Sequence, residues 1–293
     1  MSRCFKIFYL VAFIFLISLS ACDIINPSEQ TPSFIAVDTL MLKTNGFEQG
    51  SKKHAITDCW VYVNNKLIGI FEVPFKVPVL ESGIKEIQIE PGIKNSGSDS
   101  KREIYPLMKG WYVTKNLSEG AVLTLEPEFE YRNVIFDLIE DFEDIGIEFE
   151  TSLNSDTIIH IVSEPQAQEG KSMYFALDNE RRKFECLTSK LYEIPKTGRV
   201  FLEISFKGNG YFNFGVFSVE NVGTGLSEVR KNIYTFKPKD TWTTIYIDLN
   251  YHVINAKGER FRLFFTCVRP ENEKTEKTEI FIDNIKLTYL LAQ

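Results

Sequence analysis

Acidic side chains crowd one short segment of the chain, residues 137 to 150. A pair of carboxyl groups can hydrolyse a glycosidic bond only when the fold holds them about 5 to 10 Å apart across a cleft, and one acidic strand gives no sign of a cleft. A serine nucleophile is not indicated either, because there is no GxSxG motif and His160 and His252 follow no suitable serine motif. We predict that the protein is not an enzyme.

Calcium binding explains some of these acidic residues better than catalysis does. Asp141 and Glu143 lie two residues apart, so in a strand they share one side, opposite Phe142, and Asp283 belongs to the last predicted strand. Oxygen ligands from several segments suit a hard cation. A structural calcium ion is therefore the one cofactor that the residues predict; the alternative is that these acids are solvated edge groups or strand caps.

The three widely spaced cysteines that follow Cys22 are interpreted as buried thiols with at most one disulfide among them: Cys59, Cys186 and Cys267.

A ligand surface is predicted from side chains that alternate along the strands. In YFNFGVF, residues 211–217, every second residue continues the apolar core period and leaves Tyr211, Asn213 and Phe217 facing outward. Sugars bind surfaces where aromatic planes alternate with polar groups, because ring faces stack and hydroxyls need partners. On the condition that residues of other strands share that sheet, the predicted ligand-binding residues are Glu203, Tyr211, Asn213, Tyr246 and Arg262. The alternatives are an ordinary solvent face or a protein-contact surface.

The first residues have the layout of a lipoprotein leader. Basic Arg3 and Lys6 precede an apolar run, residues 7–19, which is too short to span a membrane and has the length of a signal-peptide core. The sequence Leu19-Ser20-Ala21-Cys22 then resembles the lipobox of bacterial lipoproteins. The resemblance implies that residues 1–21 are removed and that Cys22 carries palmitate-type acyl chains, which anchor the mature protein in a membrane. An ordinary secretory signal is the alternative.

The charge of the chain excludes one class of partner. The formal net charge is −7, and loss of a leader with two basic residues and no acid makes the mature chain two units more negative. An acidic chain has no electrostatic footprint for nucleic acid. We therefore expect no nucleic-acid partner, and membrane contact through the lipid anchor alone.

The elements that position these residues are predicted to be strands throughout. Residues 22–33 are polar with two prolines and suit a tether, and residues 34–131 show short β-branched and aromatic runs broken by turn residues. In CWVYVNNKLIGIFEV, residues 59–73, Asn64 and Asn65 supply a hairpin turn. The stretch from Val61 to Gly92 resembles the PEGA class of small β-sandwich modules, with Asn65 where that class usually has Gly. The resemblance implies a noncatalytic, immunoglobulin-like, envelope-associated module.

The second predicted domain, residues 132–293, contains longer alternating strands. In RVFLEISFKG, Val200, Leu202, Ile204 and Phe206 form the apolar face. Strands of this length favour a jelly-roll sandwich. An early DFED, a middle WxxIxIDL and a terminal IFIDNI together resemble carbohydrate-binding jelly rolls of the galactose-binding-like group, in which a calcium ion often joins the first and last strands.

These patterns predict an all-β protein of two β-sandwich domains. The resemblances imply a noncatalytic outer-membrane lipoprotein of Bacteroidota type that binds glycan through its C-terminal jelly roll, on either the cell-surface or the periplasmic side. The alternative is a structural or assembly subunit of an outer-membrane protein complex. A catalytic jelly roll that acts on glycans is a third reading.

Overall fold

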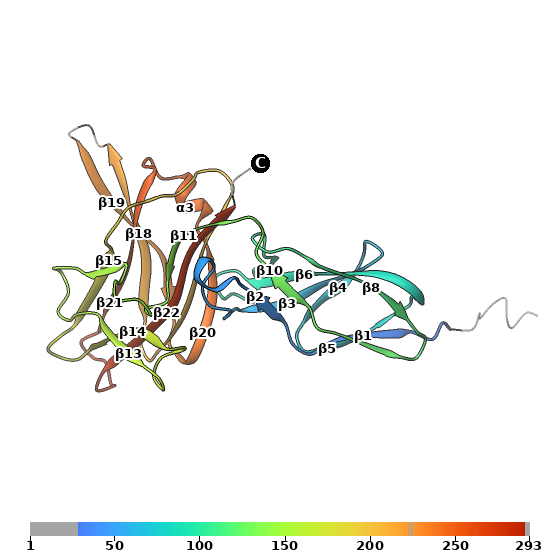
Figure 1. Ribbon diagram of the computed structural model, residues 1–293. Coiled ribbons are helices and arrows are strands. Elements are labelled where there is room, and N and C mark those ends of the chain that lie inside the picture. The colour runs from blue at the N-terminus through green and yellow to red at the C-terminus, as the bar shows by residue number, and fades with distance from the viewer. Residues whose placement is uncertain (1–28, 222, 224, 291–293) are drawn as a thin grey trace, which may run out of the picture.

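A computed structural model describes residues 29–221, 223 and 225–290 (Figure 1). Two β-sandwiches lie side by side, the C-terminal one on the left of Figure 1 and the N-terminal one on the right. The predicted all-β class with two sandwich domains is confirmed. The predicted leader and Cys22 lie outside the described residues. Among the helices of the described ranges, none has the length and apolar character that a membrane crossing requires.

The N-terminal sandwich packs one five-stranded sheet against two small sheets. The large sheet has the order β4-β3-β6-β7, with β8 also paired to β6, and the small sheets are β5-β1-β9 and β10-β2. The last strand, β10, closes the domain by pairing with β2. The elements are β1 (Ser33–Val37), β2 (Met41–Lys43), the 3-10 turn η1 (Gly46–Glu48), β3 (Ile56–Val63), β4 (Lys66–Glu72), β5 (Phe75–Val79), β6 (Gly83–Lys94), β7 (Arg102–Ile104), β8 (Trp111–Leu117), β9 (Val122–Leu125) and β10 (Glu128–Glu130).

The hairpin of β3 and β4 follows directly from its turn residues. Asn64 and Asn65 have φ of 47° and 62°, and both values lie in the left-handed region that a two-residue turn of this kind requires. Asn tolerates that region better than most residues with a side chain. The alternation of β3 then sends Cys59, Val61 and Val63 into the core.

The C-terminal sandwich has two six-stranded sheets. One has the order β13-β14-β22-β17-β20, with β11 paired to β22, and the other β12-β15-β21-β18-β19, with β16 paired to β21. The strands are β11 (Ile135–Glu140), β12 (Phe149–Thr151), β13 (His160–Ser163), β14 (Lys171–Leu177), β15 (Lys183–Thr188), β16 (Tyr192–Glu193), β17 (Arg199–Gly208), β18 (Phe212–Asn221), β19 (Leu226–Phe236), β20 (Lys239–Asp248), β21 (Arg260–Val268) and β22 (Thr278–Leu290), and the short helix α3 spans Asn250–Ile254.

The strand order identifies the C-terminal domain as a jelly roll. Its eight principal strands are β14, β15 and β17 to β22 in chain order. One sheet takes the first, eighth, third and sixth of them, and the other takes the second, seventh, fourth and fifth. That double-sheet order is the jelly-roll arrangement.

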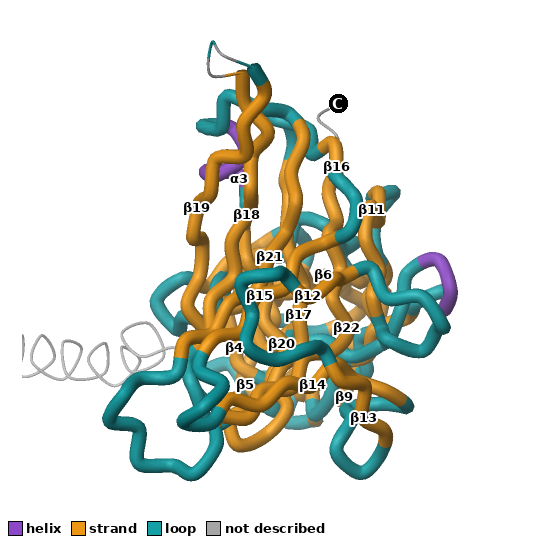
Figure 2. Tube along the Cα trace, turned by 90° about the vertical axis from the view of Figure 1, so that its left-hand side faces the viewer, coloured by secondary structure: helices purple, strands orange, loops and turns teal. Residues whose placement is uncertain are grey.

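The two sheets of the jelly roll differ in what covers them. The sheet that contains β17, β20 and β22 faces the N-terminal domain, and its Phe201 and Tyr246 belong to the same buried cluster as the N-terminal core. We call it the proximal sheet. The other, which contains β15, β18, β19 and β21, is the distal sheet, and Figure 2 shows its β18 and β19 rising beyond the neighbouring strands.

Candidate functional site

Two of the five predicted ligand-binding residues do not belong to an open surface. Glu203 on β17 and Tyr246 on β20 are 3% and 1% exposed. The Glu203 carboxylate accepts hydrogen bonds from the hydroxyls of Tyr105 (2.6 Å) and Tyr131 (2.7 Å), and the Tyr246 hydroxyl accepts one from the backbone N–H of Ala55 (3.1 Å). Their placement beside Arg262 on one sheet was wrong, because β17 and β20 belong to the proximal sheet and β21 to the distal sheet. They are buried because the N-terminal domain covers their face of the proximal sheet.

The other predicted residues lie at the distal sheet. Asn213 on β18 and Arg262 on β21 both point outward from it, and Phe217 of β18 lies directly opposite Arg262. Tyr211 lies in the loop before β18 and is 62% exposed. Its backbone carbonyl accepts the S–H of Cys267. Asn213 and Arg262 therefore share one surface, and Tyr211 stands at its edge.

Outward side chains of the distal sheet form rows across neighbouring strands. Strand register places Phe217 between Arg230 of β19 and Arg262 of β21. The next row runs through Asn232, Gly215, Phe264 and Leu187, and the third through Thr235, Asn213, Thr266 and Glu185. We call the surface formed by these three rows the distal face. Within it Phe264 has no exposed area and Glu185 is buried, so the other side chains form its accessible part.

Arg230 organises the centre of the distal face. Its guanidinium carbon lies 4.2 Å from the ring centre of Phe264 and 5.4 Å from that of Phe217, and the two rings are 4.9 Å apart. An added Cβ on Gly215 would lie 2.4 Å from the Phe264 ring, so glycine lets the ring lie flat on the strand. Sequence reasoning missed Arg230, because β19 carries polar residues on both faces.

Charged groups around these rings are held in place by partners. Arg230 donates to Glu185, whose other carboxylate oxygen accepts from the hydroxyl of Ser152 at 2.9 Å. Burial raises the pKa of Glu185, but the hydrogen bonds from Arg230 and Ser152 outweigh burial and leave the pKa below its ordinary value. Arg262 lies 3.7 Å from Glu228, and its Nε is buried with no hydrogen-bond partner among the described residues.

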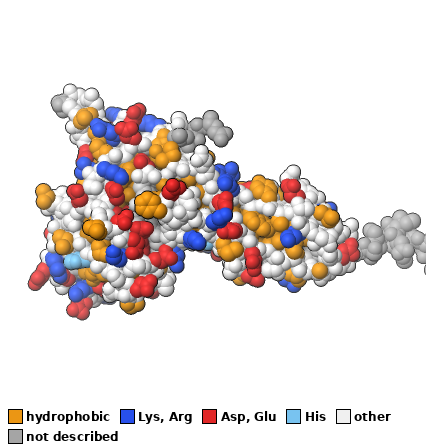
Figure 3. Space-filling model, viewed as in Figure 1, with side chains coloured by type: hydrophobic (Ala, Val, Ile, Leu, Met, Phe, Trp, Pro, Cys, Tyr) orange, Lys and Arg blue, Asp and Glu red, His pale blue; other side chains and the backbone are white. Residues whose placement is uncertain are grey.

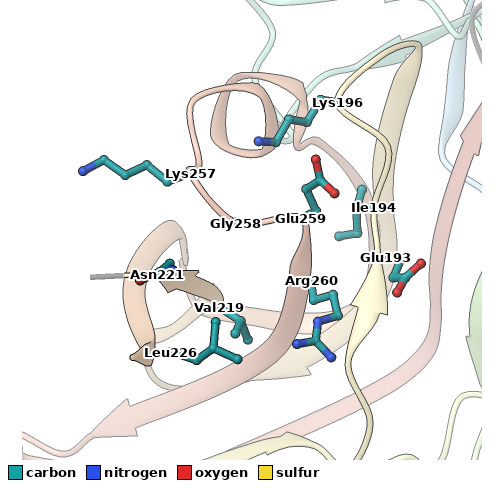
Figure 4. A pocket seen from close by; sticks show the side chains of 10 residues that line it. All are labelled: Glu193, Ile194, Lys196, Val219, Asn221, Leu226, Lys257, Gly258, Glu259 and Arg260. Atoms are coloured by element: carbon teal, nitrogen blue, oxygen red, sulfur yellow. The ribbon is translucent and has the colours of Figure 1, made fainter. Parts of the chain in front are cut away.

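A cavity of about 510 Å³ continues the distal face at one end. Val219 and Arg260 occupy the next outward positions of β18 and β21 and line it. Figure 4 shows Val219, Leu226 and Arg260 on one side of this cavity, with Lys196 and the loop through Glu259 on the other. Aromatic, guanidinium, carboxylate and amide groups thus follow one another from Asn213 to this cavity. Such a surface can stack a sugar ring and hydrogen-bond its hydroxyls.

The predicted calcium ligands gather at a second place. Asp141, Glu143 and Asp283 line one cavity of about 370 Å³, together with Glu169. Among the described residues, however, no three acidic, histidine or cysteine side chains are arranged to hold a metal ion. Instead, Glu143 accepts from the backbone N–H of Lys171, and Asp283 accepts from the Ser172 hydroxyl at 2.7 Å. As arranged, these residues do not fit a calcium ion.

Burial raises the pKa values of one carboxyl group and of the cysteine thiols. It raises the pKa of Asp283 to about 7 and the pKa values of Cys59 and Cys267 to about 12. Cys59, Cys186 and Cys267 are free and buried. Their thiols stay protonated at neutral pH and offer no nucleophile.

The surface does not segregate charge on the side that Figure 3 displays. Acidic and basic side chains are interspersed there over the C-terminal domain, with hydrophobic groups between them. A ligand on this side of the C-terminal domain would therefore meet mixed rather than single-sign charge.

Comparison with known proteins gives distant structural neighbours only. No family model matches the chain, and no curated protein matches it. The family 11 carbohydrate-binding module of the cellulase Lic26A-Cel5E of Clostridium thermocellum is similar at 13% identity and a TM-score of 0.37, over 53% of this chain and 94% of that one. A xylan-binding domain of family 22 gives 13% and 0.37, over 54% and 96%. Likenesses at this level carry no argument, and the fold assignment rests on the strand order.

Proposed function

We propose that the protein is a noncatalytic, lipid-anchored envelope protein that binds a glycan across the distal face of its jelly roll. One observation carries the binding proposal: Arg230, Phe217 and Arg262 stand in one row, with Asn213 two rows away on the same face and an open cavity at the other end. Phe217 offers a partly exposed ring, and the guanidinium and amide groups offer hydrogen bonds to hydroxyls.

Affinity electrophoresis and calorimetry of residues 29–293 against soluble polysaccharides test the binding proposal. We expect Phe217→Ala or Arg262→Ala to raise the dissociation constant about tenfold, because each variant loses one stacking or charge-assisted contact. Phe47→Ala is the matched control, since Phe47 is 92% exposed and lies in the N-terminal domain. Equal binding by all three variants, or no binding to any polysaccharide, contradicts the proposal.

The lipid anchor is tested separately. Mass spectrometry of the native protein is expected to find an acylated Cys22 at the N-terminus, and Cys22→Ala is expected to release the protein from the membrane fraction. Protease treatment of intact cells then distinguishes the cell surface from the periplasmic side of the outer membrane. An unmodified start after another residue would overturn the anchor without touching glycan binding.

Docking to an outer-membrane protein complex is the second candidate function. The outward face of β4, β3, β6 and β8 exposes apolar groups, with Leu67, Ile70 and Tyr112 each between 44% and 57% exposed. An exposed apolar patch of this kind is typical of protein contacts. Pull-down of the lipidated protein discriminates the two functions, because a stoichiometric membrane-protein partner without glycan affinity favours docking.

A further inference from the structure

A second row of aromatic side chains crosses the half of the proximal sheet that the N-terminal domain leaves uncovered. Strand register places His160, Tyr174, Phe281 and Lys207 side by side on β13, β14, β22 and β17. Trp242 of β20 joins them, with its ring 6.4 Å from that of Phe281. None of the five is fully buried. We call these five residues the aromatic row.

The rings of the aromatic row are held by specific contacts. Tyr174 and Phe281 lie 4.8 Å apart, and the Tyr174 hydroxyl donates to Glu279 at 2.7 Å. The Lys207 Nζ lies 4.6 Å from the ring centre of Phe281 and 5.1 Å from that of Trp242. These contacts fix the rings in place while leaving part of each open to a ligand.

A cavity of about 220 Å³ adjoins the aromatic row. Lys207, Lys239, Asp240 and Glu279 line it, with Asn209 and Phe281. Two cations and two anions balance, so the cavity does not favour a ligand of either charge. The Trp242 Nε1 is buried, so Trp242 offers a ligand the accessible part of its ring and not its N–H.

We propose that the aromatic row is a second glycan-binding site, and that its ligand is a neutral polysaccharide chain lying across the strands. A row of rings with hydrogen-bonding groups at their edges matches a polymer that alternates apolar ring faces with hydroxyls. Balanced charge disfavours an acidic or basic polymer. A protein contact would instead be expected to have an apolar centre depleted of charged residues. The site lies on the sheet opposite the distal face and does not depend on it.

Fluorine NMR of residues 29–293 labelled with 5-fluorotryptophan tests this inference. The chain contains Trp60, Trp111 and Trp242, so Trp242→Phe assigns the resonance of interest. Mannohexaose, xylohexaose and a mixed-linkage glucan tetrasaccharide serve as probes. We expect at least one of them to shift the Trp242 resonance in a saturable manner. Asp240→Ala, at an exposed position of the cavity, and Phe281→Ala are each expected to raise about tenfold the dissociation constant obtained from that shift.

Phe217→Ala on the distal face is the matched control. A Trp242 shift that persists in Phe217→Ala and weakens in Phe281→Ala supports the second site, whether or not the distal face binds. Glycan binding that is lost in Phe217→Ala, with an unmoved Trp242 resonance, overturns the second site and leaves the proposed function standing. An unmoved resonance with no binding anywhere overturns both.

Discussion

At the scale of single residues, Asp283 is a carboxyl group with a pKa of about 7 in the folded protein, against an ordinary value of 3.8. Its burial is the main cause. The folded state therefore holds the proton more tightly than the unfolded state does. The stabilisation that the protonated Asp283 carboxyl gives the folded state is fully present below about pH 4. It is lost as the pH rises from about 4 to about 7.

Asp283→Asn is expected to remove this pH dependence. Asn keeps an acceptor for Ser172 and cannot ionise. The free energy of unfolding of the variant should therefore exceed that of the wild type by up to roughly 4 kcal/mol at pH 8 and match it near pH 4. Urea unfolding at the two pH values measures the difference. A variant less stable than the wild type at pH 8 would show that the carboxylate is needed in its charged form.

Calcium binding can be tested at the cavity that Asp141, Glu143 and Asp283 line. Since no group of three suitable side chains is arranged for a metal in the described residues, we expect millimolar calcium to leave the melting temperature unchanged at pH 7.5. Scanning calorimetry with calcium and with a chelator measures it. A rise of several degrees that Asp283→Asn abolishes would restore the calcium site predicted from the sequence.

Loss of Glu203 should lower the stability of the folded protein strongly. Glu203→Ala leaves the hydroxyls of Tyr105 and Tyr131 without their acceptor inside a buried interface. We expect the free energy of unfolding to fall by about 3 kcal/mol. Glu228→Ala, which removes a 41% exposed side chain from an ion pair, should cost less than about 1 kcal/mol. Chemical denaturation compares the two, and equal losses would refute the role of the buried network.

At the scale of elements, the turn between β3 and β4 depends on positive φ at both of its residues. Asn65→Gly is expected to stabilise the protein by a few tenths of a kcal/mol, and Asn65→Val to destabilise it by about 1 to 2 kcal/mol, because a β-branched residue resists this region. Thermal unfolding of both variants checks the order. Equal melting temperatures would mean that the turn relaxes to another conformation.

Side-chain alternation predicted the buried face of each long strand and little about the opposite face. Val200, Leu202 and Ile204 are core residues as expected. Glu203 was expected to belong to a ligand-binding surface. It is buried together with Phe201 of the same strand face, because the N-terminal domain covers both. No local pattern carries that information, since the contact is set by how the two domains pack.

The candidate site was predictable to the same extent. Asn213 and Arg262 follow from alternation along β18 and β21, whereas their neighbour Arg230 does not, since β19 has no clear apolar face. Sequence alone also could not bring β21 beside β18, because strand order in a jelly roll joins segments far apart in the chain.

At the scale of the whole molecule, the two domains share one buried interface. Residues 132–293 expressed alone would expose Phe201 and Tyr246, which are buried in the intact chain. We expect that fragment to bind a hydrophobic dye and to aggregate at lower temperature than the whole protein. Light scattering during heating measures this, and Phe201→Thr with Tyr246→Thr should improve the fragment. A fragment as soluble as the intact chain would show that the interface is dispensable.

The order of the domains along the molecule has a consequence for the proposed lipid-anchored form. β1 lies at the end of the N-terminal domain away from the jelly roll (Figure 1), and the buried interface prevents free rotation between the domains. In the proposed lipid-anchored form, each copy would therefore hold its distal sheet at the end of a rigid two-domain body, away from β1. A long polymer could then engage several copies at once, and its retention would rise through avidity far above the affinity of one molecule.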